Sequence, residues 1–336
     1  MDFVPNDDSE PLVPTVDIGA FLSDDSSPEA QKVVESVRAA CKKTGFFQIT
    51  GHGLPERIQR ELFQAAQRFF SLNEEVKTKL DARTTVGRRG YDAMESQSYH
   101  ADTKPDLKEG FFVGHDYPLD DPNVQAKRFF MGQNVWPEST VLSRSAFRGP
   151  VETYFQEIHT LALKMLEIIE RTLCQGSGVF RDFTRGNTVS VLRILHYPPV
   201  PSLLPVYSSK GIQQQLGAGA HTDFGAITLL LQDEHSGLEV LDPMVNTFVS
   251  VNPTPNAIVF NVGDMLSFWT GNEYKSSVHR VINKASEDRY SAAFFYDGAL
   301  DCTLEPFYRN DTTTERNSLN VEQHLLKRIN ESYGSV

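Results

Sequence analysis

Two pieces of this sequence carry residue types that bind a metal ion. His221-Thr222-Asp223 offers an imidazole and a carboxylate two positions apart, and His279 offers a second imidazole farther along the chain. In an extended chain, residues i and i+2 project to the same side, so His221 and Asp223 can reach one ion from one strand end. Two histidines and one carboxylate are the ligand set of mononuclear non-haem iron centres with open coordination positions. The sequence therefore predicts such a centre, with His279 supplied by another strand.

The His-x-Asp pattern alone is weak evidence, because chance produces it. Nine histidines, each followed two places later by an acidic residue with probability 44/336, give about 1.2 chance occurrences. A second copy, His100-Ala101-Asp102, lies in the polar run 94–108, which has no strand pattern. His221-Thr222-Asp223 instead follows the glycine-rich turn 217–220 and leads into the apolar run 224–231. This context favours His221-Thr222-Asp223 as the metal-binding copy.

A further pair begins ten residues beyond His279. Arg289 and Ser291 are two residues apart and therefore share one face of an extended strand. A guanidinium group grips a carboxylate through two parallel hydrogen bonds, and a hydroxyl on the same face adds a third donor. We expect this pair to anchor an organic acid beside the metal.

Strands must position these residues, and the sequence becomes strand-like beyond residue 188. The pattern predicts strands at 188–197, 226–232, 238–241, 248–251, 257–261, 265–269, 277–282 and 291–296. Eight short strands separated by turn signals are typical of a jelly roll closed at both ends. The predicted fold is mainly β with flanking helices, of the α+β class, around a double-stranded β-helix (jelly-roll) core.

The remainder of the chain is mostly helical. Apolar spacing predicts helices at 28–43, 55–70, 73–81, 150–174 and 319–333, with two early strands at 14–18 and 45–49. Regular periodicity is lost between residues 84 and 137, and irregular segments of this length usually serve a function. We expect one integrated unit, in which residues 1–137 form a helical and loop region that covers the barrel mouth. Residues 138–336 then supply the long helix, the jelly roll and the last helix.

Composition limits the partners of the protein. The formal net charge of −12 argues against nucleic acid and anionic membrane surfaces, since both require a basic face. The sequence has no apolar run of transmembrane length and no signal-peptide pattern, and its three cysteines are widely spaced, as in a reducing compartment. We expect a cytoplasmic protein that acts on a small molecule. The sequence leaves the oligomeric state open, and a monomer is compatible with it.

The motifs, taken in order, resemble those of the iron(II)- and 2-oxoglutarate-dependent dioxygenases, in the branch that includes isopenicillin N synthase and the plant flavonoid and hormone oxygenases. The resemblance covers most of the chain. It rests on Gly45-Phe46-Phe47 with Gly51-His52-Gly53, Gly90-Tyr91, Lys108-Glu109, Asn134 with Trp136-Pro137, Tyr197-Pro198, Asn261-x-Gly263-Asp264, Tyr274-Lys275-Ser276 and His279-Arg280-Val281. Joint occurrence in this order is specific, whereas each motif alone is not. Tyr197-Pro198-Pro199 departs from the usual Tyr-Pro-x-Cys-Pro of plant members, which leaves the substrate undetermined.

The resemblance implies roles for individual residues. His221, Asp223 and His279 are similar to the metal ligands of the family. Arg289 and Ser291 resemble the pair that holds the distal carboxylate of 2-oxoglutarate, and Tyr197 resembles a tyrosine that hydrogen-bonds the same cosubstrate. The dioxygenase domain would span about 187–300, with Fe(II) as cofactor, 2-oxoglutarate and O2 as cosubstrates, and ascorbate as reductant. The implied reaction oxidises a C–H bond of a small organic molecule, by hydroxylation, desaturation or cyclisation, and we favour a specialised metabolite as substrate.

Four residues are candidate substrate contacts. Phe295 shares the strand face of Arg289 and Ser291, although core packing explains it equally well. Arg193 lies on the Tyr197 side of its strand, where a second anion contact and a buried ion pair are both compatible with the pattern. Tyr91 and Phe111 come from the irregular segment 84–137, which we hypothesise sets substrate choice together with residues 200–220, as a lid.

Three alternatives stay open at this point. An iron oxidase similar to isopenicillin N synthase would need no keto acid, and its Arg and Ser would grip the carboxylate of the substrate itself. A jelly-roll binding protein could keep the metal ligands without turnover. A zinc hydrolase fits the triad, but the sequence supplies no clear general base.

Overall fold

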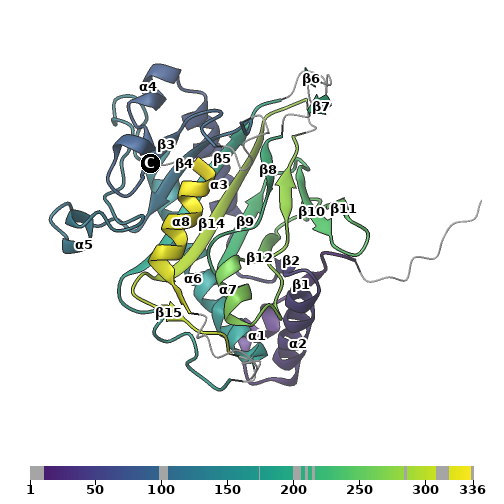
Figure 1. Cartoon of the computed structure of the whole chain (residues 1–336). Coiled ribbons are helices and arrows are strands. Elements are labelled where there is room, and N and C mark those ends of the chain that lie inside the picture. The colour runs from purple at the N-terminus through teal and green to yellow at the C-terminus, as the bar shows by residue number, and fades with distance from the viewer. Residues whose placement is uncertain are drawn as a thin grey trace, which may run out of the picture.

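The computed structural model describes residues 11–97, 105–173, 175–199, 206–208, 211–213, 216–283, 286–307 and 318–333. Two β-sheets face each other and form a jelly roll, as the sequence predicts (Figure 1). The larger sheet has the strand order β1-β2-β12-β9-β14-β5-β4-β3, and the smaller has the order β11-β10-β13-β8. The cavity between them is lined by residues of both sheets.

The strand bounds are as follows. The larger sheet contains β1 (Thr15–Asp17), β2 (Phe46–Thr50), β3 (Gly90–Asp92), β4 (Glu109–Gly114), β5 (Thr188–Tyr197), β9 (Ile227–Gln232), β12 (Ile258–Val262) and β14 (Arg289–Ala299). The smaller contains β8 (Ala218–His221), β10 (Leu238–Asp242), β11 (Thr247–Ser250) and β13 (His279–Val281). Two short pairs are separate, β6 (Val206–Ser208) with β7 (Gly211–Gln213) and β15 (Thr303–Leu304) with β16 (Leu319–Asn320).

Helices cover the outer face of the larger sheet. The helices are α1 (Gly19–Ser23), α2 (Pro28–Lys43), α3 (Glu56–Phe70), α4 (Glu74–Thr78), the 3-10 turn η1 (Ala82–Thr84), α5 (Pro122–Gln125), α6 (Arg148–Thr172), α7 (Asp264–Trp269) and α8 (Val321–Tyr333). α2 begins where Ser27 accepts a hydrogen bond from the Ala30 amide at 3.1 Å, a typical N-cap followed by proline. α6 packs its apolar stripe against β14 and β9, and α3 contacts β5 and β14.

The alternation of side chains along β14 positions the site. Phe294 and Tyr296 point away from the cavity, into the hydrophobic core between the larger sheet and α6. The centroid of the Phe294 ring lies 5.6 Å from that of Phe155. The alternate residues Arg289, Ser291, Ala293 and Phe295 therefore face the cavity and line it. One strand thus contributes both to the core and to the functional site.

Three sequence predictions about the fold are wrong. Residues 265–269, predicted as a strand, form helix α7, because the extended residue Gly263 serves as the N-cap of a helix that begins at Asp264. A five-residue apolar run is compatible with a strand or a buried helix, and periodicity does not separate them. The predicted turn 217–220 contributes most of β8, which pairs with β13. The segment 84–137 contains β3 and β4, which extend the larger sheet beyond β5.

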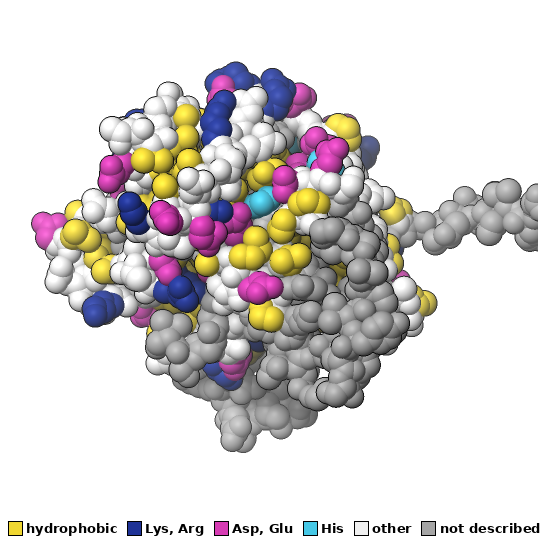
Figure 2. Space-filling view, turned by 90° about the horizontal axis from the view of Figure 1, so that it is seen from above, with side chains coloured by type: hydrophobic (Ala, Val, Ile, Leu, Met, Phe, Trp, Pro, Cys, Tyr) yellow, Lys and Arg dark blue, Asp and Glu magenta, His cyan; other side chains and the backbone are white. Residues whose placement is uncertain are grey.

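The surface agrees with the acidic composition. On the face shown in Figure 2, Lys and Arg side chains lie among Asp and Glu side chains rather than in one continuous basic area. Across the described ranges, the helices are all too short or too polar to cross a bilayer.

Candidate metal centre

The structure brings the three predicted metal ligands together. β8 ends at His221, which pairs with His279 of β13, and Asp223 follows two residues after His221. Asp223 Oδ1 lies 3.7 Å from His221 Nε2 and 3.6 Å from His279 Nε2, and the three donor atoms all lie within 4.8 Å of one another. Imidazole and carboxylate ligands bind a transition metal at roughly 2.0–2.2 Å, so two ligands of one ion lie up to about 4.4 Å apart. The measured pair distances suit a shared ion.

Hydrogen bonds orient each of the three groups. The Nδ1 atoms of His221 and His279 lie 2.7 Å from the Gly219 carbonyl and 3.1 Å from the Ser277 carbonyl, so each Nδ1–H donates and each Nε2 carries the lone pair. Asp223 Oδ2 accepts hydrogen bonds from Thr228 Oγ1 at 2.6 Å and Asn261 Nδ2 at 2.8 Å, which turns Oδ1 toward the histidines. The donor set is therefore assembled in the orientation that a metal needs.

The protonation states also suit metal binding. Burial, reinforced by the nearby His279 imidazole, holds the pKa of His221 well below its usual value, so this imidazole is neutral. Burial opposes ionisation of Asp223, but electrostatic interactions with the two neighbouring imidazoles and the hydrogen bonds from Thr228 and Asn261 outweigh it and lower the pKa of Asp223. Metal ligands must be deprotonated, and these two are.

The predicted carboxylate anchor lies in the same cavity. Arg289 is 0% exposed, with Nε donating to the His235 carbonyl at 3.1 Å and Nη2 donating to Gln232 Oε1 at 2.9 Å. Its guanidinium carbon lies 4.9 Å from the Tyr197 ring centroid. Within the described part of the chain, Arg289 Nη1 and Ser291 Oγ are buried without a hydrogen-bond partner. An unsatisfied buried donor costs about 1–3 kcal/mol, so two of them on one strand face indicate a ligand that accepts hydrogen bonds.

The substrate candidates fall into two groups. Phe295 and Arg193 line the cavity, and Arg193 forms an ion pair with Asp92 and a 2.9 Å hydrogen bond to Gln97, which matches the ion-pair alternative. Tyr91 and Phe111 do not line it. The Tyr91 hydroxyl donates to a Glu109 carboxylate oxygen at 2.7 Å, away from the cavity.

Phe111 does not line the cavity because its side chain points to the opposite face of β4. Its ring packs against Phe69 at 4.7 Å and Phe147 at 5.0 Å, in the core beneath the sheet. Neighbouring residues of a strand point to opposite faces, so Phe112 lines the cavity instead. The lid prediction and the rival His100-Ala101-Asp102 concern residues partly outside the described ranges: 98–104, 200–205, 209–210 and 214–215 are not described.

Two charged cavity residues were missed from the sequence. Lys108 is buried and paired with Asp106, whose other oxygen accepts a 2.8 Å hydrogen bond from the Gly219 amide in β8. Burial lowers the pKa of Lys108 to about 8. Asp297 also lines the cavity, and burial, followed by the charge of Asp223, raises its pKa to about 7. Lys108 carried a motif signal in Lys108-Glu109, whereas Asp297 carried a signal only in the inward alternation of β14.

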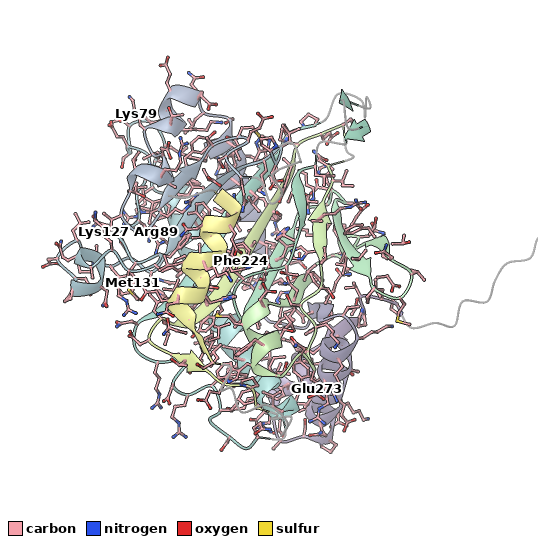
Figure 3. The ribbon with its side chains drawn as sticks, in the orientation of Figure 1. Lys79, Arg89, Lys127, Met131, Phe224 and Glu273 are labelled. Carbon is pink, nitrogen blue, oxygen red and sulfur yellow. The ribbon has the colours of Figure 1, made fainter. Side chains whose placement is uncertain are left out.

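The C-terminal helix closes one side of the cavity. Leu325 and Ile329 of α8 line it, and Arg328 reaches Asp264 Oδ2 at 3.1 Å and Thr222 Oγ1 at 3.2 Å. Phe224, labelled in Figure 3, lies beside α8, and the Arg328 guanidinium carbon is 4.5 Å from the centroid of its ring. The cavity has an empty volume of about 1070 Å³, which includes solvent space at its open mouth.

Comparison with known proteins finds relatives that match most of the chain. The N-terminal model of non-haem dioxygenases in morphine synthesis matches residues 13–139, and the 2OG-Fe(II) oxygenase superfamily model matches residues 188–298. The 2-oxoglutarate-dependent dioxygenase citB of Monascus ruber is 49% identical over 322 residues, covering 96% of this chain and 95% of citB. Clavatol oxidase claD of Penicillium crustosum is 45% identical over 331 residues, covering 96% of each.

Solved structures show the same fold. A full-length Neurospora crassa protein, solved in complex with alpha-KG, superposes with a TM-score of 0.80 at 25% identity, covering 97% of each chain. A second structure of this Neurospora protein contains alpha-KG and thymine, with a TM-score of 0.80 at 25% identity, covering 97% of this chain and 98% of that one. With relatives this similar over nearly their whole length, the chain belongs to the iron(II)- and 2-oxoglutarate-dependent dioxygenases.

Proposed function

We propose that His221, Asp223 and His279 bind Fe(II) in this dioxygenase, and that Arg289, Ser291 and Tyr197 hold 2-oxoglutarate beside it. The observation that carries this assignment is the pair of unsatisfied donors, Arg289 Nη1 and Ser291 Oγ, in the cavity that contains the three metal donors. A dicarboxylate held at one end by these donors leaves its other end for the metal. Ferrous iron held there would let O2 oxidise two partners at once, 2-oxoglutarate to succinate and carbon dioxide, and a C–H bond of the substrate.

The substrate is a small organic molecule whose C–H bond is oxidised. The relatives support this class, since the Neurospora crassa protein is solved with thymine and claD is named a clavatol oxidase. The cavity wall supports it too, because Phe112, Phe295 and Leu325 offer apolar surface that excludes water from the reacting bond. Relatives named 2-oxoglutarate-dependent favour a keto-acid-dependent reaction over the alternative of an iron oxidase that needs none. We further propose a specialised metabolite as the natural substrate and ascorbate as the reductant that keeps the iron ferrous.

Succinate formation tests the proposal. The purified protein, supplied with Fe(II), ascorbate and 2-oxoglutarate in air, should form succinate slowly without substrate. Omission of Fe(II) should abolish this turnover, and omission of ascorbate should shorten its duration. His279→Ala should form no succinate, while Arg280→Ala, a neighbour on β13 paired with Glu239 outside the cavity lining, should retain activity. Iron-independent succinate formation, or full activity of the His279 variant, would contradict the assignment.

A further inference from the structure

Asp297 is a cavity carboxyl group that the proposed iron and keto-acid sites do not use. It is 5% exposed and lines the cavity. Among the residues that the structure describes, no side chain or amide forms a hydrogen bond or an ion pair with its carboxyl group. A carboxyl group in a largely apolar cavity is unfavourable without a hydrogen-bonding partner. The position therefore indicates a polar partner that arrives with a ligand.

Strand register places Asp297 beside the metal ligands. In the pairing of β14 with β9, Phe295 lies opposite Thr228, whose hydroxyl donates to Asp223 at 2.6 Å. Asp297 is the next inward residue after Phe295, and it lies so close to Gly225 that a Cβ atom on this glycine would overlap Asp297 Oδ1. Its carboxyl group therefore adjoins the chain segment that directly follows Asp223.

The keto-acid anchor lies toward the other end of the same strand. Ser291 pairs with Gln232 of β9, and Arg289 lies beyond it. Asp223 is bonded to Thr228, which lies opposite Phe295 in the sheet. Asp223 is therefore beside a point of β14 that lies between the keto-acid anchor and Asp297. A ligand group that reaches Asp297 therefore lies toward the end of the cavity away from the proposed keto-acid anchor.

The walls of the cavity are rich in aromatic rings. The cavity lining includes six phenylalanines, Phe46, Phe112, Phe129, Phe130, Phe224 and Phe295. Leu325 and Ile329 of α8 add aliphatic surface. Aromatic rings pack well against other flat rings in edge-to-face or offset arrangements. The lining therefore favours a flat, apolar ring system over a strongly hydrated or highly charged substrate.

The ligand group that binds Asp297 must be able to form a hydrogen bond with the protonation state of its carboxyl group. Because burial raises the pKa of Asp297 to about 7, both its protonated and its ionised forms are populated near neutral pH. A hydroxyl group donates to a carboxylate and accepts from a carboxylic acid, whereas an ammonium group only donates. A hydroxyl group on the ligand is thus compatible with either form.

From this placement we propose that Asp297 binds a ring hydroxyl group of an aromatic substrate, on the side of the metal opposite Arg289. The inference rests on the proposed function, since it takes the metal and keto-acid sites as assigned. Asp297 selects and orients the substrate through this hydrogen bond, and the phenylalanines hold the ring.

A matched pair of probes tests the hydrogen bond. The parent enzyme, loaded anaerobically with Fe(II) and 2-oxoglutarate, is titrated calorimetrically with 3,5-dihydroxytoluene and with 3,5-dimethoxytoluene, which cannot donate a hydrogen bond. We expect the dihydroxy probe to bind at least about tenfold more tightly, as for a hydrogen bond to a charged group. Asp297→Ala should reduce the preference to within about twofold. Asp297→Asn, which keeps the shape and a neutral acceptor, should retain an intermediate preference.

Controls separate this role from general packing. Leu325→Ala removes apolar contact from α8 and should weaken both probes alike, leaving their ratio unchanged. Thermal melting checks each variant, and Asp297→Asn alone decides the matter if Asp297→Ala does not fold. A parent enzyme that binds neither probe, or binds both equally, overturns the inference, as does an unchanged ratio in the folded Asp297 variants. If the parent forms succinate but lacks the preference, this inference alone fails; if it forms no succinate, the proposed function fails.

Discussion

Replacing Arg289 by alanine tests the keto-acid anchor, because the structure fixes what is lost. Two of its N–H groups are held by the His235 carbonyl and Gln232 Oε1, so the guanidinium is oriented before any ligand binds, and Nη1 has no described partner. Removing a buried, charged hydrogen-bond donor costs about 2–3 kcal/mol. The Kd of 2-oxoglutarate should therefore rise roughly 30- to 160-fold.

The assay compares the parent with the Arg289 and Ser291 variants, and each protein is titrated with two keto acids. Anaerobic calorimetry on the Fe(II)-loaded enzyme compares 2-oxoglutarate with 2-oxobutyrate, which lacks the distal carboxylate. The parent should discriminate strongly between the two keto acids, and Arg289→Ala should bind both with similar affinity while iron remains bound. Ser291→Ala, which removes a neutral donor, should weaken 2-oxoglutarate by only about two- to tenfold. An Arg289 variant that discriminates as well as the parent would refute the assignment, because the distal carboxylate would then be bound elsewhere.

Three other predictions concern the metal, pH and the irregular segment. Asp223→Ala should abolish Fe(II) binding and succinate formation together, measured by metal content after dialysis; retained stoichiometric iron would contradict it. Burial opposes protonation of His196, but hydrogen bonds to Glu109 at 2.7 Å and Asp288 at 2.8 Å outweigh it and raise the pKa of His196 above 6.5. Its stabilisation should be complete below pH 6.5 and fade as pH rises through the higher folded-state pKa, a slope in the urea unfolding free energy that His196→Gln should remove. Exchange of residues 84–137 with those of a relative should change the product profile, measured by mass spectrometry, and an unchanged profile would count against their role in substrate choice.

The sequence could predict the candidate site because its signals are local. Spacings of two residues put His221 with Asp223, and Arg289 with Ser291, on common strand faces, and the structure places both pairs in one cavity. His279 needed only the expectation that a neighbouring strand would supply it, and β13 does pair with β8. The jelly roll followed in the same way from short apolar runs and turn residues, which depend little on distant contacts.

The sequence could not predict features that depend on distant partners. β4 is buried along its whole length, so its side chains show no apolar–polar alternation. Glu109 within it is satisfied by Lys77 at 2.7 Å, Tyr91 at 2.7 Å and His196 at 2.7 Å, which come from three other elements. A charged residue in a buried strand favours a loop prediction until these partners are known. Asp297 could not be predicted as a cavity residue for the same reason. Its surroundings include Gly225 and the cavity residue Phe224, which lie more than seventy residues earlier in the chain.

The cavity-facing side of β14 carries opposite charges at its two ends, and these favour different ligands. Arg289 lies at one end and Asp297 near the other, with the small side chain of Ala293 between them. An anionic keto acid gains from Arg289 and is repelled by an ionised Asp297, whereas a hydroxylated ring gains from Asp297 and offers the buried guanidinium no counter-charge. Because the two ends favour opposite ligands, we expect the cosubstrate to bind at the Arg289 end and the substrate at the Asp297 end. A metal held by the three donors at the level of Phe295 would then have the keto acid on the Arg289 side and the substrate on the Asp297 side.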